Sequence, residues 1–241
     1  MTRNLQQFFF IFAAILLLRS SLHAQDYGKD MQKISDNYST KNIHFHLKYV
    51  FYPYDSIAVA TDSIEAYCVM DGKKFYYKMR SGGNEFVYIK NNNYYVVVDY
   101  LQKAIALKQS SQAAVPSWNV AQVDSLMHSP TANLTYKDLG NQEGEYDIQL
   151  KQGTWNKLSI VFDKSSYTLT KVIMRSSAKG KLVGQKYDKP VIVISYYEYG
   201  KQTDNSCFNV STYFSSTENP VVLSAAYKRY KLLDYIHNSS N

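Results

Sequence analysis

The sequence predicts an α+β fold with a single domain, in which one antiparallel sheet is covered by an N-terminal helix and one inserted helix. Short segments rich in Phe, Tyr and Val recur along the chain, and most alternate apolar with polar residues, as half-buried strands do. Between Asp71 and Lys108 only turn residues separate these segments, at Asp71-Gly72, Ser81-Gly82-Gly83 and Asn91-Asn92-Asn93. Such turns reverse the chain, so an antiparallel meander is expected. Two other segments have their apolar residues at helical spacing.

The first residues have the features of a secretory signal peptide, predicted to span residues 1–24. Arg3 gives a positive start, and the apolar run FFFIFAAILLL is too short to span a membrane. Small residues up to Ala24 favour cleavage before Gln25, and an uncleaved N-terminal anchor is the alternative. No Cys follows the apolar run, which excludes lipoprotein attachment by that route. We therefore expect residues 25–241 to form an exported domain without a membrane span. It would be periplasmic, secreted or surface-associated.

The mature chain begins with a predicted amphipathic helix over residues 26–39, whose apolar stripe should lie on the sheet. Alternation from Ile43 to Phe51 predicts a strand that Pro53 ends, and residues 62–70 predict the strand that leads into the meander. The inserted helix is predicted after Ser117, a suitable N-cap, with Trp118 just inside and Pro130 at its end.

More strands are expected after the inserted helix. Residues 191–199 are almost wholly apolar or aromatic, which is typical of a central strand covered on both faces. The tail at residues 227–236 fits either a strand or a short helix. The remaining predicted strands cover residues 132–136, 146–150, 158–162, 167–173 and 208–214.

Composition narrows the classes of partner. The chain has 241 residues, 45% of them hydrophobic, and a formal net charge of +7. Its Lys and Arg residues are scattered, whereas nucleic-acid binding needs them grouped, so no nucleic-acid partner is expected. The 23 tyrosines suit half-buried strands or a binding face.

The two cysteines, Cys68 and Cys207, leave two alternatives open. An oxidising compartment would permit a disulfide that closes a long loop. Strand alternation instead places Cys68 in a row with Ile64, Ala66 and Met70 that is typical of a core, while Cys207 shares its parity with polar residues. Two isolated thiols are then expected.

No catalytic, metal or cofactor signature is present, so we expect a non-enzymatic protein without a metal or cofactor. His44 and His46 share a strand face but are too few for zinc, and their expected place is the solvent face. Glu143, Glu145 and Asp147 are too sparse for a calcium loop and predict a solvated loop. A hydrolase would need a cleft that joins one of these histidines to a carboxylate.

Three Asp-Ser-aliphatic tripeptides, at Ser56, Ser63 and Ser125, resemble the acceptor pattern of general O-glycosylation in Bacteroidetes. This resemblance implies that the protein comes from a bacterium of that type and that these three serines are O-glycosylated. Ordinary turn and cap chemistry is the alternative explanation, because Asp-Ser is common in turns.

The order of elements resembles the periplasmic lipoprotein-carrier fold of the LolA-like group. The resemblance covers Asp26 to Leu232. In the stretch KLSIVFDKSSYTLTKVIM a strand ending in Asp turns into the next strand, as in that group. It implies an incomplete barrel, meaning a strongly curved sheet, with helices plugging its mouth and an apolar cavity for acyl chains. The stretches that carry it are DMQKISDNYSTKNIHFHLKY, FYYKMRSGGNEFVYIKNNNYYVVV and KLSIVFDKSSYTLTKVIM.

Two functions are therefore kept side by side. The first is binding of an apolar ligand, either a lipid or the acyl chain of a lipidated protein, against the concave face of the curved sheet. The second is an envelope protein that binds a protein or glycan through Tyr-rich surfaces such as Tyr94-Tyr95 and Tyr196-Tyr197. The predicted ligand-binding residues are Phe45, Leu47, Tyr49, Phe75, Tyr77, Trp118, Leu158, Ile160 and Tyr197.

Overall fold

The computed structural model describes residues 26–54, 60, 62–112, 132–150, 155–182, 185–202, 204–215 and 220–236. The predicted signal peptide, the helix at Trp118, and the serines Ser56 and Ser125 lie outside these residues. The described part is mostly strand, with one α-helix and four short 3-10 helices. None of the helices within those ranges is long and apolar enough to cross a membrane.

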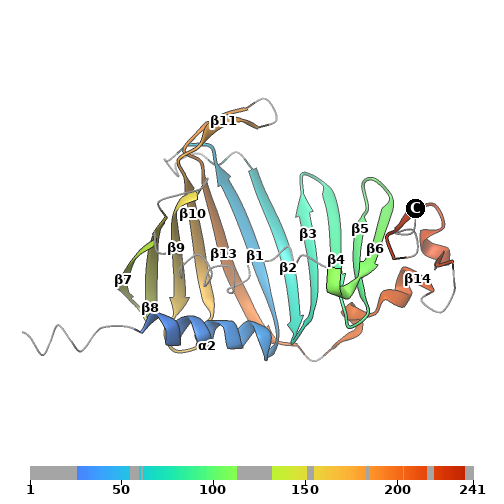
Figure 1. Ribbon diagram of the computed structural model, residues 1–241, viewed down its shortest axis with the longest axis horizontal. Helices are drawn as coiled ribbons and strands as arrows, with labels where there is room; N and C mark the ends of the chain where they lie inside the picture. The colour runs from blue at the N-terminus through green and yellow to red at the C-terminus, as the bar shows by residue number, and fades with distance from the viewer. Residues whose placement is uncertain are drawn as a thin grey trace, which may run out of the picture.

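One large sheet dominates the described chain (Figure 1). Its strands from the first half of the chain are β1 (Asn42–Tyr52), β2 (Asp62–Asp71), β3 (Lys74–Ser81), β4 (Asn84–Lys90), β5 (Tyr94–Asp99) and β6 (Ala104–Gln109). From the second half come β7 (Ala132–Gly140), β8 (Glu143–Leu150), β9 (Trp155–Asp163), β10 (Leu169–Ser176), β13 (Val191–Lys201) and β16 (Lys231–Asp234). Two small hairpins stand apart, β11 (Lys179–Leu182) with β12 (Gln185–Asp188), and β14 (Phe214–Ser215) with β15 (Val222–Leu223).

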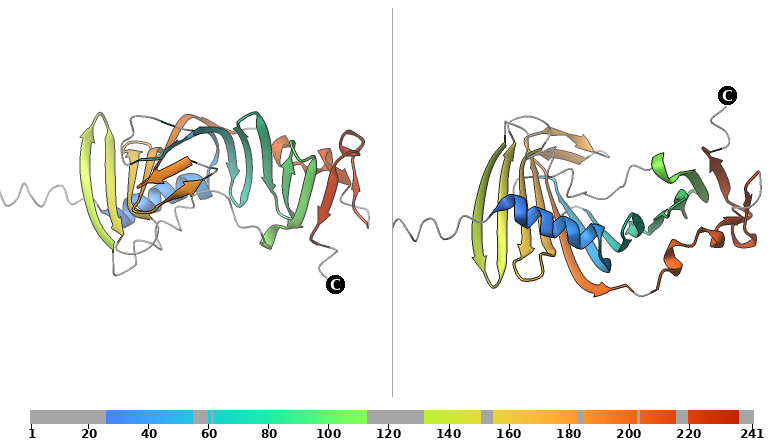
Figure 2. Two further views of the ribbon diagram at one scale, coloured as in Figure 1. Left: turned by 90° about the horizontal axis from the view of Figure 1, so that it is seen from above. Right: turned by 60° about the horizontal axis from the view of Figure 1, so that its bottom comes forward.

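The strand order is β16-β6-β5-β4-β3-β2-β1-β13-β10-β9-β8-β7, so the two halves of the chain meet where β1 pairs with β13. The expectation that residues 191–199 form a central strand is confirmed, but the expected cover on both faces is wrong, because Tyr197 and Glu198 are exposed. The sheet curves without closing (Figure 2), since β7 and β16 stand at its two ends. It is a mixed sheet, because β16 pairs parallel with β6 while the other strand pairs are antiparallel.

The predicted meander is present from β2 to β6, with each strand paired antiparallel to the next. Its first two turns use the glycines singled out in the sequence. Gly72 has a φ of 59°, and Gly82 and Gly83 have φ values of 54° and 85°. A two-residue hairpin turn needs such positive φ values, which only glycine adopts without cost.

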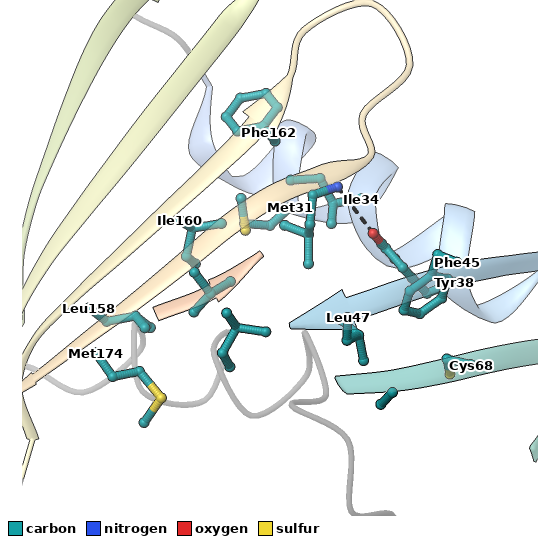
Figure 3. Close-up of a cluster of buried hydrophobic side chains, with 14 of the residues drawn as sticks. Met31, Ile34, Tyr38, Phe45, Leu47, Cys68, Leu158, Ile160, Phe162 and Met174 are labelled. Atoms are coloured by element: carbon teal, nitrogen blue, oxygen red, sulfur yellow. Dashed lines mark hydrogen bonds between the residues drawn. The ribbon is translucent and has the colours of Figure 1, made fainter. Parts of the chain in front are cut away.

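The N-terminal helix α2 (Tyr27–Ser39) is confirmed and crosses one face of the sheet (Figures 1 and 2). Asp26 caps it, with its side chain accepting a hydrogen bond from the backbone N–H of Lys29 at 3.3 Å. Met31, Ile34 and Tyr38 are buried in a core shared with strands of both halves of the chain (Figure 3). We call the face that α2 covers the inner face, and the opposite one the outer face.

Two predictions along the second half are wrong. Residues 208–214 are not one strand, because η2 (Ser206–Phe208) and η3 (Val210–Thr212) precede the two-residue β14. The side chains of Asp204 and Asn209 each accept a hydrogen bond from the backbone N–H two residues on, and such bonds favour turns over strands. Residues 143–147 are not a loop either, since they form the first half of β8.

A second core lies on the outer face of β4, β5 and β6. It is closed by the C-terminal segment, defined here as residues 204–215 and 220–236. The undecided tail proves to be η4 (Ala225–Tyr227) followed by β16. The buried members of this core are Val87, Ile89, Val96, Val98, Ile105, Leu107, Val210, Tyr213, Phe214 and Val221.

Candidate functional site

An open pocket of about 550 Å³ lies on the inner face, beside the C-terminal end of α2. Its walls come from both halves of the chain: α2, β1, β2 and β3 on one side, Leu169 of β10 and Tyr196 of β13 on the other. This volume falls in the range of about 300–1,000 Å³ that is typical of small-molecule sites.

The pocket exists because α2 is short compared with the face that it crosses. With 13 residues, α2 is about 20 Å long. From β7 to β6 the sheet is eleven strands wide, which corresponds to about 48 Å along the curve. The helix runs from β8, where Tyr27 contacts Tyr146, to β1, where Tyr38 contacts Phe45, and it ends at Ser39, where the pocket begins.

Strand register aligns the floor of the pocket in rows. Phe45, Cys68 and Tyr77 are direct neighbours across β1, β2 and β3, so their side chains lie on one face. A parallel row contains Met70 and Phe75. Rows of this kind give a continuous apolar surface, because each side chain contacts its neighbours on the adjacent strands.

Five of the predicted ligand-binding residues line this pocket: Phe45, Leu47, Tyr49, Phe75 and Tyr77. Leu158 and Ile160 lie on the same face but are buried beneath α2, in the core rather than in the pocket (Figure 3).

Tyr197 lies on the outer face, 37% exposed, with its ring 5.7 Å from that of His46. Its expected place on the concave face is not what the structure shows. Tyr197 pairs with His46 on β1 and alternates with Tyr196, which lines the pocket, so it shares the outer face with His46. A β-bulge follows it, where Phe45 faces both Glu198 and Tyr199, and Glu198 has a φ of 54°. The bulge turns Tyr199 toward the inner face together with Tyr196, although the two residues are three apart.

Sequence reasoning missed several lining residues, including Tyr38, Cys68, Met70, Leu169 and Tyr196. A signal was present for three of them. Tyr38 belongs to the helical stripe of residues 26–39, and Cys68 and Met70 share the parity of the core-like row. Pairing between β1 and β13 brings Tyr196 to the site, and that pairing joins residues about 150 positions apart in the chain.

Buried hydrogen bonds hold the wall between α2 and the pocket in place. The backbone N–H of Leu169 donates to the hydroxyl of Tyr38 at 3.1 Å, which is the dashed line in Figure 3. The hydroxyl of Tyr199 donates to the carbonyl of Leu169 at 2.8 Å, and the hydroxyls of Tyr38 and Tyr199 also contact each other. These bonds tie the helix end to β10 and β13, so this wall of the pocket is held in place.

The floor of the pocket is electrically neutral. Burial raises the pKa of the hydroxyls of Tyr38, Tyr49, Tyr77 and Tyr196. Burial also raises the pKa of the Cys68 thiol to about 12. All five groups therefore keep their protons at physiological pH.

The mouth of the pocket is polar and basic, in contrast to the floor. Lys73 in the turn after β2, Lys74 at the start of β3 and Lys90 at the end of β4 all contribute to it. No Asp or Glu is among the described residues that line the pocket. The uncharged polar residues of the mouth are Ser35, Ser39, Asn91, Asn92, Ser110 and Ser111.

The other candidate residues are not brought together into a site. His46 lies 3.5 Å from Glu198, but both side chains are exposed on the outer face. Glu145 and Asp147 are paired with Lys137 on β7. Within the described ranges no group of three or more His, Cys, Asp and Glu residues could hold a metal ion.

Neither cysteine is in a disulfide, as strand alternation favoured. Three of the four tyrosines predicted for a protein or glycan interface do not form an exposed surface. Tyr95 is 8% exposed, Tyr94 packs edge-on against Phe214, and Tyr196 lines the pocket.

No protein-family model and no curated protein matches the chain. Solved structures do resemble it at low identity. An uncharacterized conserved protein from Thermus thermophilus is 10% identical, with a TM-score of 0.46 and coverage of 87% of this chain and 99% of that one. A LolA superfamily protein from Nitrosomonas europaea is 8% identical, with a TM-score of 0.37 and coverage of 78% and 99%. The lipoprotein LppX of Mycobacterium tuberculosis is 11% identical, with a TM-score of 0.40 and coverage of 74% and 99%.

Proposed function

We propose that this chain is a non-enzymatic exported protein of the cell envelope that binds an apolar chain in the inner-face pocket. The ligand is a lipid or the acyl chain of a lipidated protein, held in a LolA-like domain spanning residues 25–241 after removal of the signal peptide. The observation that carries the proposal is the pocket itself. It is an open apolar space at the centre of the sheet, next to a helix that leaves part of the face uncovered.

Physical chemistry favours an acyl chain as the occupant. The floor consists of aliphatic, aromatic and thiol side chains whose titratable groups stay neutral. Each methylene buried against such a surface contributes about 0.8 kcal/mol, so affinity grows with chain length. The walls are already held by hydrogen bonds, which reduces the entropy lost on binding.

The hypothesis of a protein or glycan interface and that of a hydrolase gain no comparable support. Of the four tyrosines offered for a protein or glycan interface, Tyr197 alone is counted among the exposed large apolar residues of the described chain. A hydrolase would need a histidine and a carboxylate in a cleft, whereas His46 and Glu198 lie on the outer face, away from the pocket.

The test is to narrow the pocket and follow the bound ligand. Ser35 is half-buried and lines the pocket from α2, so the indole of Ser35→Trp would occupy the mouth. Gln32→Trp places the same indole on the exposed side of the same helix and is the matched control. Native mass spectrometry of protein purified without detergent should show a lipid-sized mass with wild type and Gln32→Trp.

Ser35→Trp should lose that mass and bind an acyl probe about tenfold more weakly, since displacing two methylenes is worth about 1.6 kcal/mol. Ser39→Trp, at an exposed position of the same mouth, repeats the test if Ser35→Trp fails to fold. Absence of any bound lipid together with no acyl-probe binding by wild type would contradict the proposal. So would equal binding by folded mouth variants and the control.

A further inference from the structure

The charges around the mouth of the pocket narrow the class of ligand further than the apolar floor of the pocket does. Three lysines line the pocket, and no carboxylate is among the described lining residues. Lys74 is already matched, since its ammonium lies 3.3 Å from a carboxylate oxygen of Asp71. Lys73 and Lys90 make no ion pair within the described chain. Two cations at the mouth are therefore left for a ligand to neutralise.

Lys90 has an unusual position for a lysine. It lies on the inner face itself, directly opposite Phe75 on β3 and Tyr95 on β5, both of which are buried. Its aliphatic stem can pack on these rings while the ammonium reaches the mouth. An ammonium beside an apolar surface is partly desolvated, so it gains more from an anion than a fully solvated one does.

The mouth is also fixed in place, which matters for recognition of a head group. The amide of Asn91 donates to the carbonyl of Phe208 at 3.2 Å and accepts from the backbone N–H of Tyr94 at 2.8 Å. The hydroxyl of Ser110 donates to the carbonyl of Asn91 at 2.7 Å. The turn after Lys90 is therefore tied to the C-terminal segment and to the start of η1 (Ser110–Gln112), so Lys90 is anchored beside a stable turn.

We propose that the ligand is an anionic amphiphile, whose carboxylate or phosphate head group lies between Lys73 and Lys90 while its chain runs over Phe75 and Tyr77 toward Cys68. This inference rests on the proposed function and narrows it to ligands with a negative head group. Neutral glycerides and cationic amphiphiles bind less well, because they leave both ammonium groups without a counter-charge.

The experiment compares ligands that have one chain and different heads. Delipidated protein is loaded with Nile red, a neutral probe, and titrated with dodecanoate, dodecyl phosphate, dodecanol and dodecyltrimethylammonium. The charged ligands are kept below their micelle concentrations and dodecanol below its solubility limit. The two anions should displace the probe at about tenfold lower concentration than dodecanol, because only they supply a counter-charge to the two ammonium groups. The preferred anion identifies the head group as carboxylate or phosphate.

The double variant Lys73→Gln/Lys90→Gln should lose this preference and bind the two anions no more tightly than dodecanol. Lys171→Gln/Lys201→Gln removes the same charge at two exposed positions outside the pocket and is the matched control. Equal binding of dodecanol and the anions by wild type, or a preference that survives the Lys73/Lys90 change, would overturn the head-group assignment and leave the pocket function intact. Failure of all four ligands to displace the probe would instead contradict the proposed function.

Discussion

The bulge in β13 offers a stringent test of the structure, because it predicts that one substitution stabilises the protein. Glu198 has a φ of 54°, in the left-handed region that residues other than glycine adopt only at a cost. Its side chain is 68% exposed and contributes one exposed contact, 3.5 Å from His46. Replacing it with glycine should relieve the backbone without loss of packing.

The expected size follows from two opposing contributions. Left-handed backbone costs a non-glycine residue about 1–2 kcal/mol, while glycine gives up about 0.5–1 kcal/mol in chain entropy on folding. The exposed contact between Glu198 and His46 contributes little to the free energy of unfolding, so its loss changes the balance little. Glu198→Gly should therefore raise the free energy of unfolding by about 0.5–1 kcal/mol.

Urea denaturation followed by far-ultraviolet circular dichroism measures this change. With a slope of about 2 kcal/mol per molar urea, the midpoint should rise by about 0.3–0.5 M. Glu198→Ala removes the same contact with His46 but keeps the strained backbone, so its midpoint should stay near that of wild type. A Glu198→Gly variant no more stable than Glu198→Ala would show that Glu198 is not strained and would refute this prediction.

Two further predictions concern buried titratable groups. Burial raises the pKa of Cys68 to about 12 and of Cys207 to about 11, so maleimide should label both slowly at neutral pH and faster as pH rises. Bound dodecanoate should protect Cys68, which lines the pocket, and not Cys207; equal protection would contradict the pocket assignment. Burial alone would raise the pKa of Asp147, but hydrogen bonds from Lys137 and Lys157 bring it below its usual range. The ionised carboxylate of Asp147 therefore stabilises the folded protein above pH 4, which is about the pKa of an aspartate in the unfolded chain. This stabilisation is lost as the pH falls below that value. Asp147→Asn should lower the free energy of unfolding by about 1–3 kcal/mol at neutral pH and by less in acid; a loss that does not depend on pH would contradict this assignment.

Local chemistry made the first half of the fold predictable. The apolar stripe of residues 26–39 predicts the helix, the glycines at 72, 82 and 83 determine where the strands turn, and the structure has them at those places. Alternation along residues 43–51 assigned Phe45 and Leu47 to the face that carries the pocket. These features depend on near neighbours in the chain, which is why a single sequence reveals them.

Long-range pairing could not be predicted in the same way. Residues 191–199 are apolar on both faces, so alternation does not say which side chains point inward, and the bulge at Glu198 changes the parity again. The glycosylation hypothesis stays a prediction: Ser63 is exposed on β2, and nothing in its surroundings distinguishes a modified serine from an ordinary one.

The two faces of β4, β5 and β6 explain why the ligand site lies where it does. The sequence of β5, YYVVVD, is apolar on both faces, so both faces need cover. The outer face gets it from the C-terminal segment, whose Val210, Tyr213 and Phe214 are buried there. On the inner face, Tyr88 and Val97 are only partly buried, in rows that continue from the pocket floor. A ligand chain in the pocket covers the neighbouring part of the same apolar face, formed by Phe75 and Tyr77, and stabilises the folded protein by mass action. Thermal unfolding of protein loaded with dodecanoate should therefore occur at a higher temperature than that of delipidated protein.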